Sequence, residues 1–174
     1  MAFSIATLAR IAFGPPPDLV CSETVWDTGV IELCRRTHGR RESGAFLLGQ
    51  KGKRRTIEEF VYYDDIDPDA LRHGIVEHDG RRLGALWAHC RASERSVVAD
   101  IHVHPRGYGQ SATDRANPMI AELGHMAIIL PNFARGSNLP GEIGVYEYLG
   151  NKQWRDCSSR VPTSLHLGWW PKWR

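Results

Sequence analysis

The chain has 174 residues, of which 42% are hydrophobic and 24% charged, an ordinary globular balance that predicts one domain with a sizeable core. Lys and Arg exceed Asp and Glu by only 22 − 20 = 2, so the composition disfavours a nucleic-acid-binding surface. No apolar run approaches the roughly 20 residues that a bilayer span requires, and we expect no membrane segment and no signal peptide.

The four cysteines, Cys21, Cys34, Cys90 and Cys157, form no C-x-x-C pair, so a cysteine-based zinc site is not expected. Unpaired thiols of this kind are typical of a reducing compartment. We therefore predict a cytoplasmic protein.

The first half of the chain predicts a helix, a strand pair and a second helix. Residues Phe3–Phe13 predict one or two strands, which end at the three prolines that follow. Residues Glu23–Thr37 predict a helix, with Ser22 as its N-cap and an apolar stripe along one side. The further expected elements are a buried strand at Glu42–Gly49, a return strand at Thr56–Tyr63, a loop at Asp64–Asp69, and a helix at Asp79–Ser93 with Leu83, Leu86, Trp87 and Cys90 facing inward.

The second half predicts mainly strands. The expected elements are a strand at Val97–His104, a short helix from Asn117 to Leu123, and strands at His125–Leu130, Glu142–Leu149 and Gln153–Cys157. This order predicts an α+β fold, a mostly antiparallel curved sheet flanked by helices. We expect one domain over residues 1–174, with a core at about 20–157 and an aromatic tail at 158–174, whose Trp169, Trp170 and Trp173 pack on the domain's own surface.

Two histidines end the strand predicted at Val97–His104. Alternate side chains of a strand point to the same face, so His102 and His104 share one face. Asp114 follows after a glycine-rich loop and supplies a carboxylate. Imidazole and carboxylate are good zinc ligands, and three of them leave a fourth position for water, whose pKa zinc lowers to about 7.

Two further residues complete a possible hydrolytic site. Glu42 lies at the start of a predicted core strand, where a carboxylate is costly unless it faces a site, and is a candidate general base. The Ser111 hydroxyl could donate a hydrogen bond to an oxyanion. Each feature alone has a common structural explanation: an incidental H-x-H, a Ser-x-x-Asp helix cap, and a solvated glutamate after Arg40 and Arg41.

Together, Glu42, His102-x-His104-Pro105 and Ser111-x-x-Asp114 resemble the JAMM (MPN-plus, JAB-domain) zinc metalloproteases. The resemblance covers roughly Val20 to Trp154 and includes the order of the predicted elements. It implies that His102, His104 and Asp114 bind one zinc ion, that Glu42 transfers the proton and that Ser111 stabilises the intermediate.

The resemblance further implies cleavage after the C-terminal tail of a ubiquitin-like protein, with that tail added as a strand beside the site. The chain looks similar to the stand-alone bacterial JAB proteins encoded beside E1-like and E2-like partners in conjugation and antiphage defence systems. Alternatives are a JAB peptidase that processes a sulfur-carrier or phage-tail protein, and a non-catalytic MPN scaffold. Scaffold members typically lack ligands, whereas all are present here.

The sequence departs from the family pattern in one loop. Nine residues, Pro105 to Thr113, separate His104 from Asp114, where the family usually has ten. We expect Gly107 and Gly109 to let the shorter loop close. The other histidines show no comparable grouping: we expect His125 to be a surface or packing residue, and His73 and His78 could form only a minor metal site.

Overall fold

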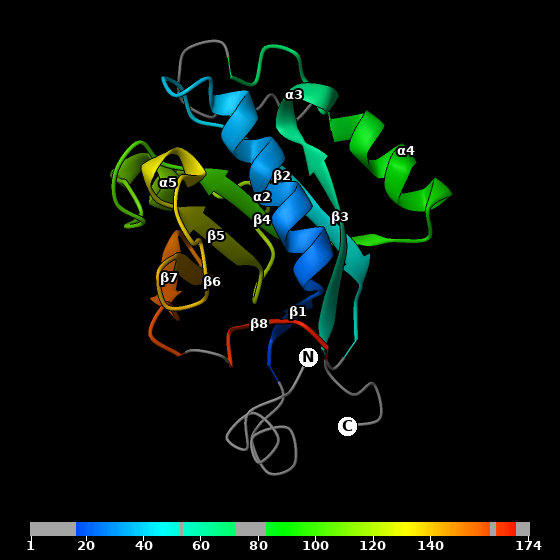
Figure 1. Cartoon of the computed structure of the whole chain (residues 1–174). Coiled ribbons are helices and arrows are strands. Elements are labelled where there is room, and N and C mark those ends of the chain that lie inside the picture. The colour runs from blue at the N-terminus through cyan, green and yellow to red at the C-terminus, as the bar shows by residue number, and fades with distance from the viewer. Residues whose placement is uncertain (1–16, 53, 72–82, 161–162, 170–174) are drawn as a thin grey trace.

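A mixed sheet forms the centre of the computed structural model, which describes residues 17–52, 54–71, 83–160 and 163–169 (Figure 1). Its eight strands are β1 (Leu19–Cys21), β2 (Gly44–Gln50), β3 (Arg55–Tyr62), β4 (Ser96–Val103), β5 (Met126–Leu130), β6 (Gly144–Gly150), β7 (Gln153–Asp156) and β8 (Leu165–Leu167). The spatial order is β7-β6-β5-β4-β2-β3-β1-β8. The strand expected within Phe3–Phe13, and His73 and His78, lie outside the described residues.

The pairing places β4 in the middle of the sheet. It runs antiparallel to β2, with His102 opposite Gly44, and parallel to β5, with His102 beside Ile129. Among the described strands, antiparallel pairs outnumber parallel pairs by four to three, so the sheet is mixed rather than mostly antiparallel. The α+β class is confirmed.

Helices cover the two faces of the sheet. They are α2 (Glu23–Thr37), α3 (Tyr63–Ile66), α4 (Gly84–Ala92), α5 (Ala112–Ala116) and the 3₁₀ turn η2 (Asn132–Ala134). Figure 1 shows α2 crossing one face, where it packs with Ala45 and Leu47 of β2 in the larger apolar cluster. The alternate residues Phe46 and Leu48 face the other side, in a second cluster with residues of α3 and α4. The buried strand β2 thus joins two cores.

Helix α2 has the predicted bounds. The Ser22 side chain accepts a hydrogen bond from the Val25 N–H at 3.2 Å, as an N-cap does. Trp26, Val30 and Leu33 are buried in one stripe against the sheet. His38 ends the helix in the left-handed region at φ 50°.

Three expectations about local structure are wrong. The helix expected from Asn117 to Leu123 is absent from this described stretch. The helix here is α5, which begins after the Ser111 cap and ends at Ala116, because Pro118 disfavours helical angles at Asn117. Trp87 is 39% exposed, whereas Leu86 and Cys90 face the core. The loop expected at Asp64–Asp69 begins with residues of α3.

The end of the described chain differs from the expected tail. Strand β8 joins the edge of the sheet beside β1, and Leu165 is fully buried. Trp169 is 61% exposed, contrary to the expectation of a side chain packed on the domain; Trp170 and Trp173 lie outside the described residues.

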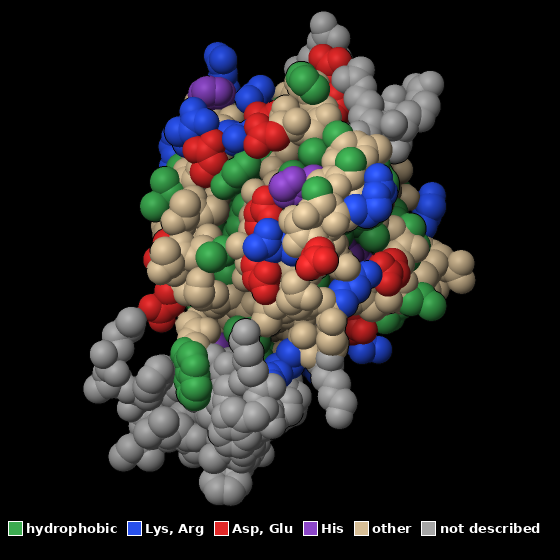
Figure 2. Space-filling view, turned by 90° about the vertical axis from the view of Figure 1, so that its right-hand side faces the viewer, with side chains coloured by type: hydrophobic (Ala, Val, Ile, Leu, Met, Phe, Trp, Pro, Cys, Tyr) green, Lys and Arg blue, Asp and Glu red, His purple; other side chains and the backbone are tan. Residues whose placement is uncertain are grey.

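The face in Figure 2 shows acidic and basic side chains interspersed rather than gathered by sign. None of the described helices combines the length and the apolar character that crossing a membrane requires.

Candidate metal centre

Strand β4 presents two imidazoles at its carboxyl end. His102 is the last residue but one of the strand, and His104 is the first residue after the strand ends at Val103. The backbone of His104 is held on both sides, because its N–H donates to the Leu130 carbonyl at 2.9 Å and its carbonyl accepts from the Phe133 N–H at 2.8 Å. Phe133 belongs to η2, whose three residues all have positive φ, between 54° and 58°. Such angles are costly outside glycine, and they occur here directly behind a candidate ligand.

The carboxylate comes from α5. Asp114 is the third residue of this helix and forms a capping box with Ser111. The Ser111 N–H donates to Asp114 Oδ2 at 2.6 Å, and the Asp114 N–H donates to Ser111 Oγ at 3.1 Å. The cap fixes the carboxylate and leaves the hydroxyl proton of Ser111 free to be donated elsewhere.

The three predicted ligands converge. His102 Nε2 and His104 Nε2 lie 3.0 Å apart, His104 Nε2 lies 3.3 Å from Asp114 Oδ2, and His102 Nε2 lies 3.6 Å from Asp114 Oδ1. Ligands about 2.0 Å from a tetrahedral zinc ion are separated by roughly 3.3 Å. The side chains are 10%, 12% and 18% exposed, so a fourth ligand can enter. The donor set and spacing therefore fit one zinc ion.

Asp114 and His104 shift each other's pKa. Burial would raise the pKa of Asp114, but hydrogen bonds with His102 and His104 outweigh it and hold that pKa well below the ordinary value. Burial would likewise lower the pKa of His104, but Asp114 and Glu42 raise it above the ordinary value. The carboxylate is thus ionised and ready to act as a ligand.

Glu42 lies next to His104. The ladder between β2 and β4 extends one bond beyond Gly44 and His102, because the Val103 N–H donates to the Ser43 carbonyl at 2.9 Å. This register brings Glu42 opposite His104, on the face shared with His102. Its charge acts on the imidazole, since it is one of the causes of the raised pKa of His104. Glu42 is half-buried and outside the ligand triad, as a general base requires.

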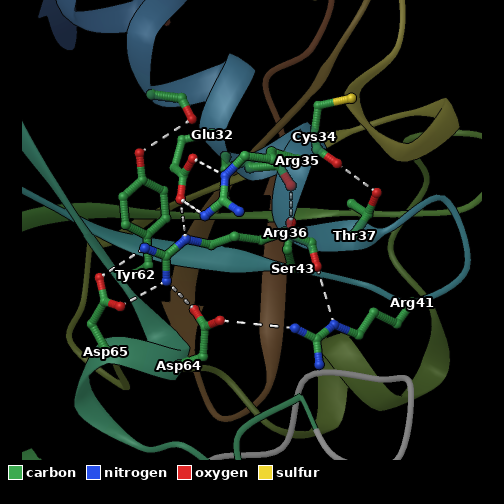
Figure 3. A network of polar contacts seen from close by, with 12 residues as sticks. Glu32, Cys34, Arg35, Arg36, Thr37, Arg41, Ser43, Tyr62, Asp64 and Asp65 are labelled. Atoms are coloured by element: carbon green, nitrogen blue, oxygen red, sulfur yellow. Dashed lines mark hydrogen bonds and ion pairs between the residues drawn. The ribbon is translucent and has the colours of Figure 1, made fainter.

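The residues on both sides of Glu42 are anchored to α2 (Figure 3). The Ser43 hydroxyl donates to the Leu33 carbonyl at 2.8 Å, and Arg41 Nε donates to the Arg36 carbonyl at 3.1 Å. Arg36 itself binds the carboxylates of Asp64 and Asp65, which connects the end of α2 to α3. The short segment that carries Glu42 is therefore fixed by a network of polar contacts.

The shortened loop closes without the help that we expected from its glycines. Neither Gly107 nor Gly109 has a positive φ, and a Cβ at either position would meet no atom within 4 Å. The close approach lies elsewhere: a Cβ on Gly144 would be 2.5 Å from the Tyr108 carbonyl oxygen. Glycine is thus needed in β6, opposite the loop, rather than in the loop itself.

A recess opens beside the triad. It is lined by Asp100, His102, Gln110, Thr113, Asp114, Asn117, Pro118, Met119, Ala127 and Trp154. At its floor, Asp100 is 2% exposed and lies 2.6 Å from His125 Nε2. The Tyr63 hydroxyl donates to the other carboxylate oxygen at 3.4 Å. The sequence predicts His125 as a surface or packing residue. It is buried, and the parallel register of β4 and β5, which pairs Asp100 with Ala127, brings it to Asp100.

Comparisons with known proteins find similar folds and give no information on the site. No family model matches the chain. Among similar solved structures, one is a protein from Desulfitobacterium hafniense, with 14% identity and a TM-score of 0.59 over 86% of this chain and 92% of that chain. Another is a protein from Salinibacter ruber, with 16% identity and a TM-score of 0.52 over 78% of this chain and 86% of that chain. At these identities the likeness concerns the fold alone.

Proposed function

We propose that this protein is a zinc-dependent peptidase of the JAMM type, with a JAB-like fold, that cleaves after the C-terminal tail of a ubiquitin-like protein. The observation that carries the proposal is the convergence of His102, His104 and Asp114 at ligand spacing, with Glu42 beside His104. Residues from two separate strand ends and a helix meet at one half-buried point. Titratable groups gathered in this way are typical of functional sites.

Hydrolysis of an amide requires a proton to leave the attacking water and to reach the departing amine. We assign this proton transfer to Glu42, because its carboxylate lies beside the triad without belonging to it. Zinc, when bound, supplies the Lewis acidity that makes water a nucleophile at neutral pH. Ser111 retains a hydroxyl proton for the oxyanion, because its oxygen is the acceptor of the helix-cap bond.

The fold constrains how a substrate tail could bind. The edges of the described sheet are β7 and β8, whereas the site lies on β4 at its centre. A tail added as a strand beside the site would therefore pair with the exposed loop from Pro105 to Gly109, which lines an open depression next to His104. The lack of side chains at Gly107 and Gly109 leaves the backbone there accessible.

Metal analysis is the first test. We expect purified protein to contain about one zinc ion per chain and His104→Ala to contain none. Two imidazoles and a carboxylate also hold ferrous iron in oxygenases, so iron must be measured in the same samples. Iron in place of zinc would refute the proposed hydrolytic chemistry.

Cleavage is the second test, with a ubiquitin-like protein fused to a lysine-bearing target as substrate. We expect the wild type to cut after the tail, and Glu42→Gln to retain zinc but lose at least about 100-fold in rate, as removal of a general base does. Active Glu42→Gln protein would exclude Glu42 as the base. A zinc-loaded wild type without cleavage would favour the MPN scaffold.

The biological setting belongs to the same proposal. An adjacent gene for a ubiquitin-like, E1-like or E2-like protein would support a role in conjugation or antiphage defence, in the cytoplasm. Neighbouring genes for a sulfur carrier or for phage-tail proteins would instead favour the processing alternatives.

A further inference from the structure

The segment that carries Ser111 and Asp114 cannot support itself. Helix α5 has five residues, none of them buried, and the loop from Pro105 to Gly109 before it is exposed. A helix of this length is unstable without outside contacts. The capping box and a bond from the Arg115 guanidinium to the Gln110 carbonyl, at 3.1 Å, are both internal to the segment. From outside the segment, Asp114 is contacted by His102 and His104, and the Arg106 carbonyl accepts from the Asn132 N–H at 2.7 Å. Further contacts fix the chain on both sides of Ser111 and Asp114.

The first of these further contacts is made by Tyr146 of β6. Its side chain is largely buried, and its hydroxyl donates to the Tyr108 carbonyl at 3.0 Å. Gly144, two residues earlier on the same strand, makes room for that carbonyl. Tyr108 belongs to the loop that runs from His104 to Ser111. Fixing Tyr108 therefore restrains the chain between one candidate ligand and the helix that carries Asp114.

The second contact is made by Trp154 of β7. Its indole Nε1 donates to the Arg115 carbonyl at 3.2 Å, and Arg115 directly follows Asp114. The indole packs on Tyr148, with ring centroids 4.9 Å apart at 60°. Trp154 also lines the recess beside Asp114. Since β6 and β7 pair through Tyr148 and Trp154, the two contacts come from one hairpin.

We propose that the β6–β7 hairpin is a two-point clamp in which Tyr146 and Trp154 are positioning residues for the metal ligands. Tyr146 holds the segment before Ser111, and Trp154 holds it after Asp114. The functional consequence rests on the proposed zinc site, but the mechanical claim concerns the protein without metal. Groups that orient metal ligands typically change metal affinity by 10-fold to 100-fold when they are removed.

Two variants remove one donor each, Tyr146→Phe and Trp154→Phe. Tyr148→Phe is a matched control, because the Tyr148 hydroxyl accepts a bond from the Lys152 N–H inside the hairpin. Trp87→Phe, on α4, controls for the loss of an indole. Thermal unfolding and circular dichroism establish that all four variants fold.

The first measurement is hydrogen exchange of the zinc-free proteins in peptides that cover residues 107–115. We expect exchange about 10-fold faster in Tyr146→Phe and Trp154→Phe, as loss of one hydrogen bond predicts, with β4 and β5 unchanged. The two controls should exchange like the wild type. If both clamp variants exchange at the wild-type rate, the proposed clamp is refuted, irrespective of the zinc measurements.

The second measurement is zinc affinity, by competition with a chromogenic chelator, together with the absorption spectrum of the cobalt(II) form. We expect an affinity loss of about 10-fold or more in each clamp variant and an altered cobalt spectrum. Faster exchange with unchanged zinc affinity would overturn the positioning role. Failure of the wild type itself to bind zinc would refute the proposed function instead, and the exchange data would still decide whether the hairpin restrains the segment.

Discussion

At the residue scale, two histidine–carboxylate pairs of nearly equal length lie in opposite environments. His125 Nε2 is 2.6 Å from Asp100 Oδ1, and the side chains are 3% and 2% exposed. His89 Nε2 is 2.7 Å from Glu59 Oε1, with 43% and 29% exposed. Because the two distances are nearly equal, a difference in stability between the two pairs reflects their burial. Removing one partner of a buried pair leaves the other without compensation for its lost hydration.

We therefore expect His125→Ala to lower the free energy of unfolding by about 3–5 kcal/mol, since the Asp100 carboxylate would lose its short contact and retain the long bond from Tyr63. His89→Ala should lower it by less than about 1 kcal/mol. Urea unfolding of both variants at neutral pH measures the difference. Equal losses in the two variants would mean that the Asp100–His125 pair is not an important buried interaction.

These residues also show what sequence can and cannot predict. His102, His104 and Asp114 lie within 13 residues of chain, so strand alternation and one loop are enough to bring them together. Asp100 and His125 are 25 residues apart and meet only through the register of two parallel strands. Tyr146 and Trp154 lie still further from the segment that they contact, and no local pattern marks them.

At the element scale, loop closure depends on a glycine in the strand opposite the loop. We expect Gly144→Ala to weaken zinc binding and lower stability, because the new methyl group would meet the Tyr108 carbonyl and the Tyr146 ring. Gly107→Ala and Gly109→Ala should leave stability unchanged or raise it by up to about 1 kcal/mol. Chelator competition and urea unfolding of the three variants test this. A large loss of stability in Gly107→Ala would mean that the tight contact lies in the loop.

The polar network at the end of α2 predicts acid sensitivity (Figure 3). Hydrogen bonds from Arg35 and then Arg36, opposed by burial, lower the pKa of Glu32 from 4.5 to about 2. Because the pKa is lower in the folded state, ionised Glu32 stabilises the protein above pH 4.5, and this contribution disappears as the pH falls from 4.5 to about 2.

We expect Glu32→Gln to be less stable than the wild type at pH 6 and equally stable near pH 2. Urea midpoints across this pH range measure the effect. Glu122→Gln is the control, because Glu122 pairs with Lys51 at a well-exposed site. A stability difference for Glu32→Gln that is independent of pH would mean that the charge of Glu32 is not the cause.

A helix boundary was predicted correctly where a single local cap pattern was present. Ser22 caps α2 as predicted, and the bounds of that helix were correct. For α5, two cap patterns compete, at Ser111 and at Asn117, and local sequence does not decide between them. The capping box of Ser111 with Asp114 prevails, while Met119 and Ile120 pack against the second apolar cluster in irregular structure.

At the scale of the whole molecule, the candidate metal site connects parts of the fold that the two apolar cores leave separate. His102 and His104 belong to the central strand β4, whereas Asp114 belongs to α5, which has no buried residue of its own. A ligand that binds only the folded state stabilises it by mass action, by about 2.7 kcal/mol at 100 times its dissociation constant. Zinc should therefore stabilise the entire domain rather than the site alone.

We expect zinc at that concentration to raise the melting temperature by roughly 5–10 °C, because each kcal/mol shifts the midpoint of a domain of this size by about 2–4 °C. A chelator should reverse the shift. His104→Ala, measured in the same way, should show no response to either, and magnesium should not replace zinc, since two of the three donors are imidazoles. If zinc raised the melting temperature of His104→Ala as much as that of the wild type, the stabilising ion would be bound elsewhere, and the triad would not be the metal centre.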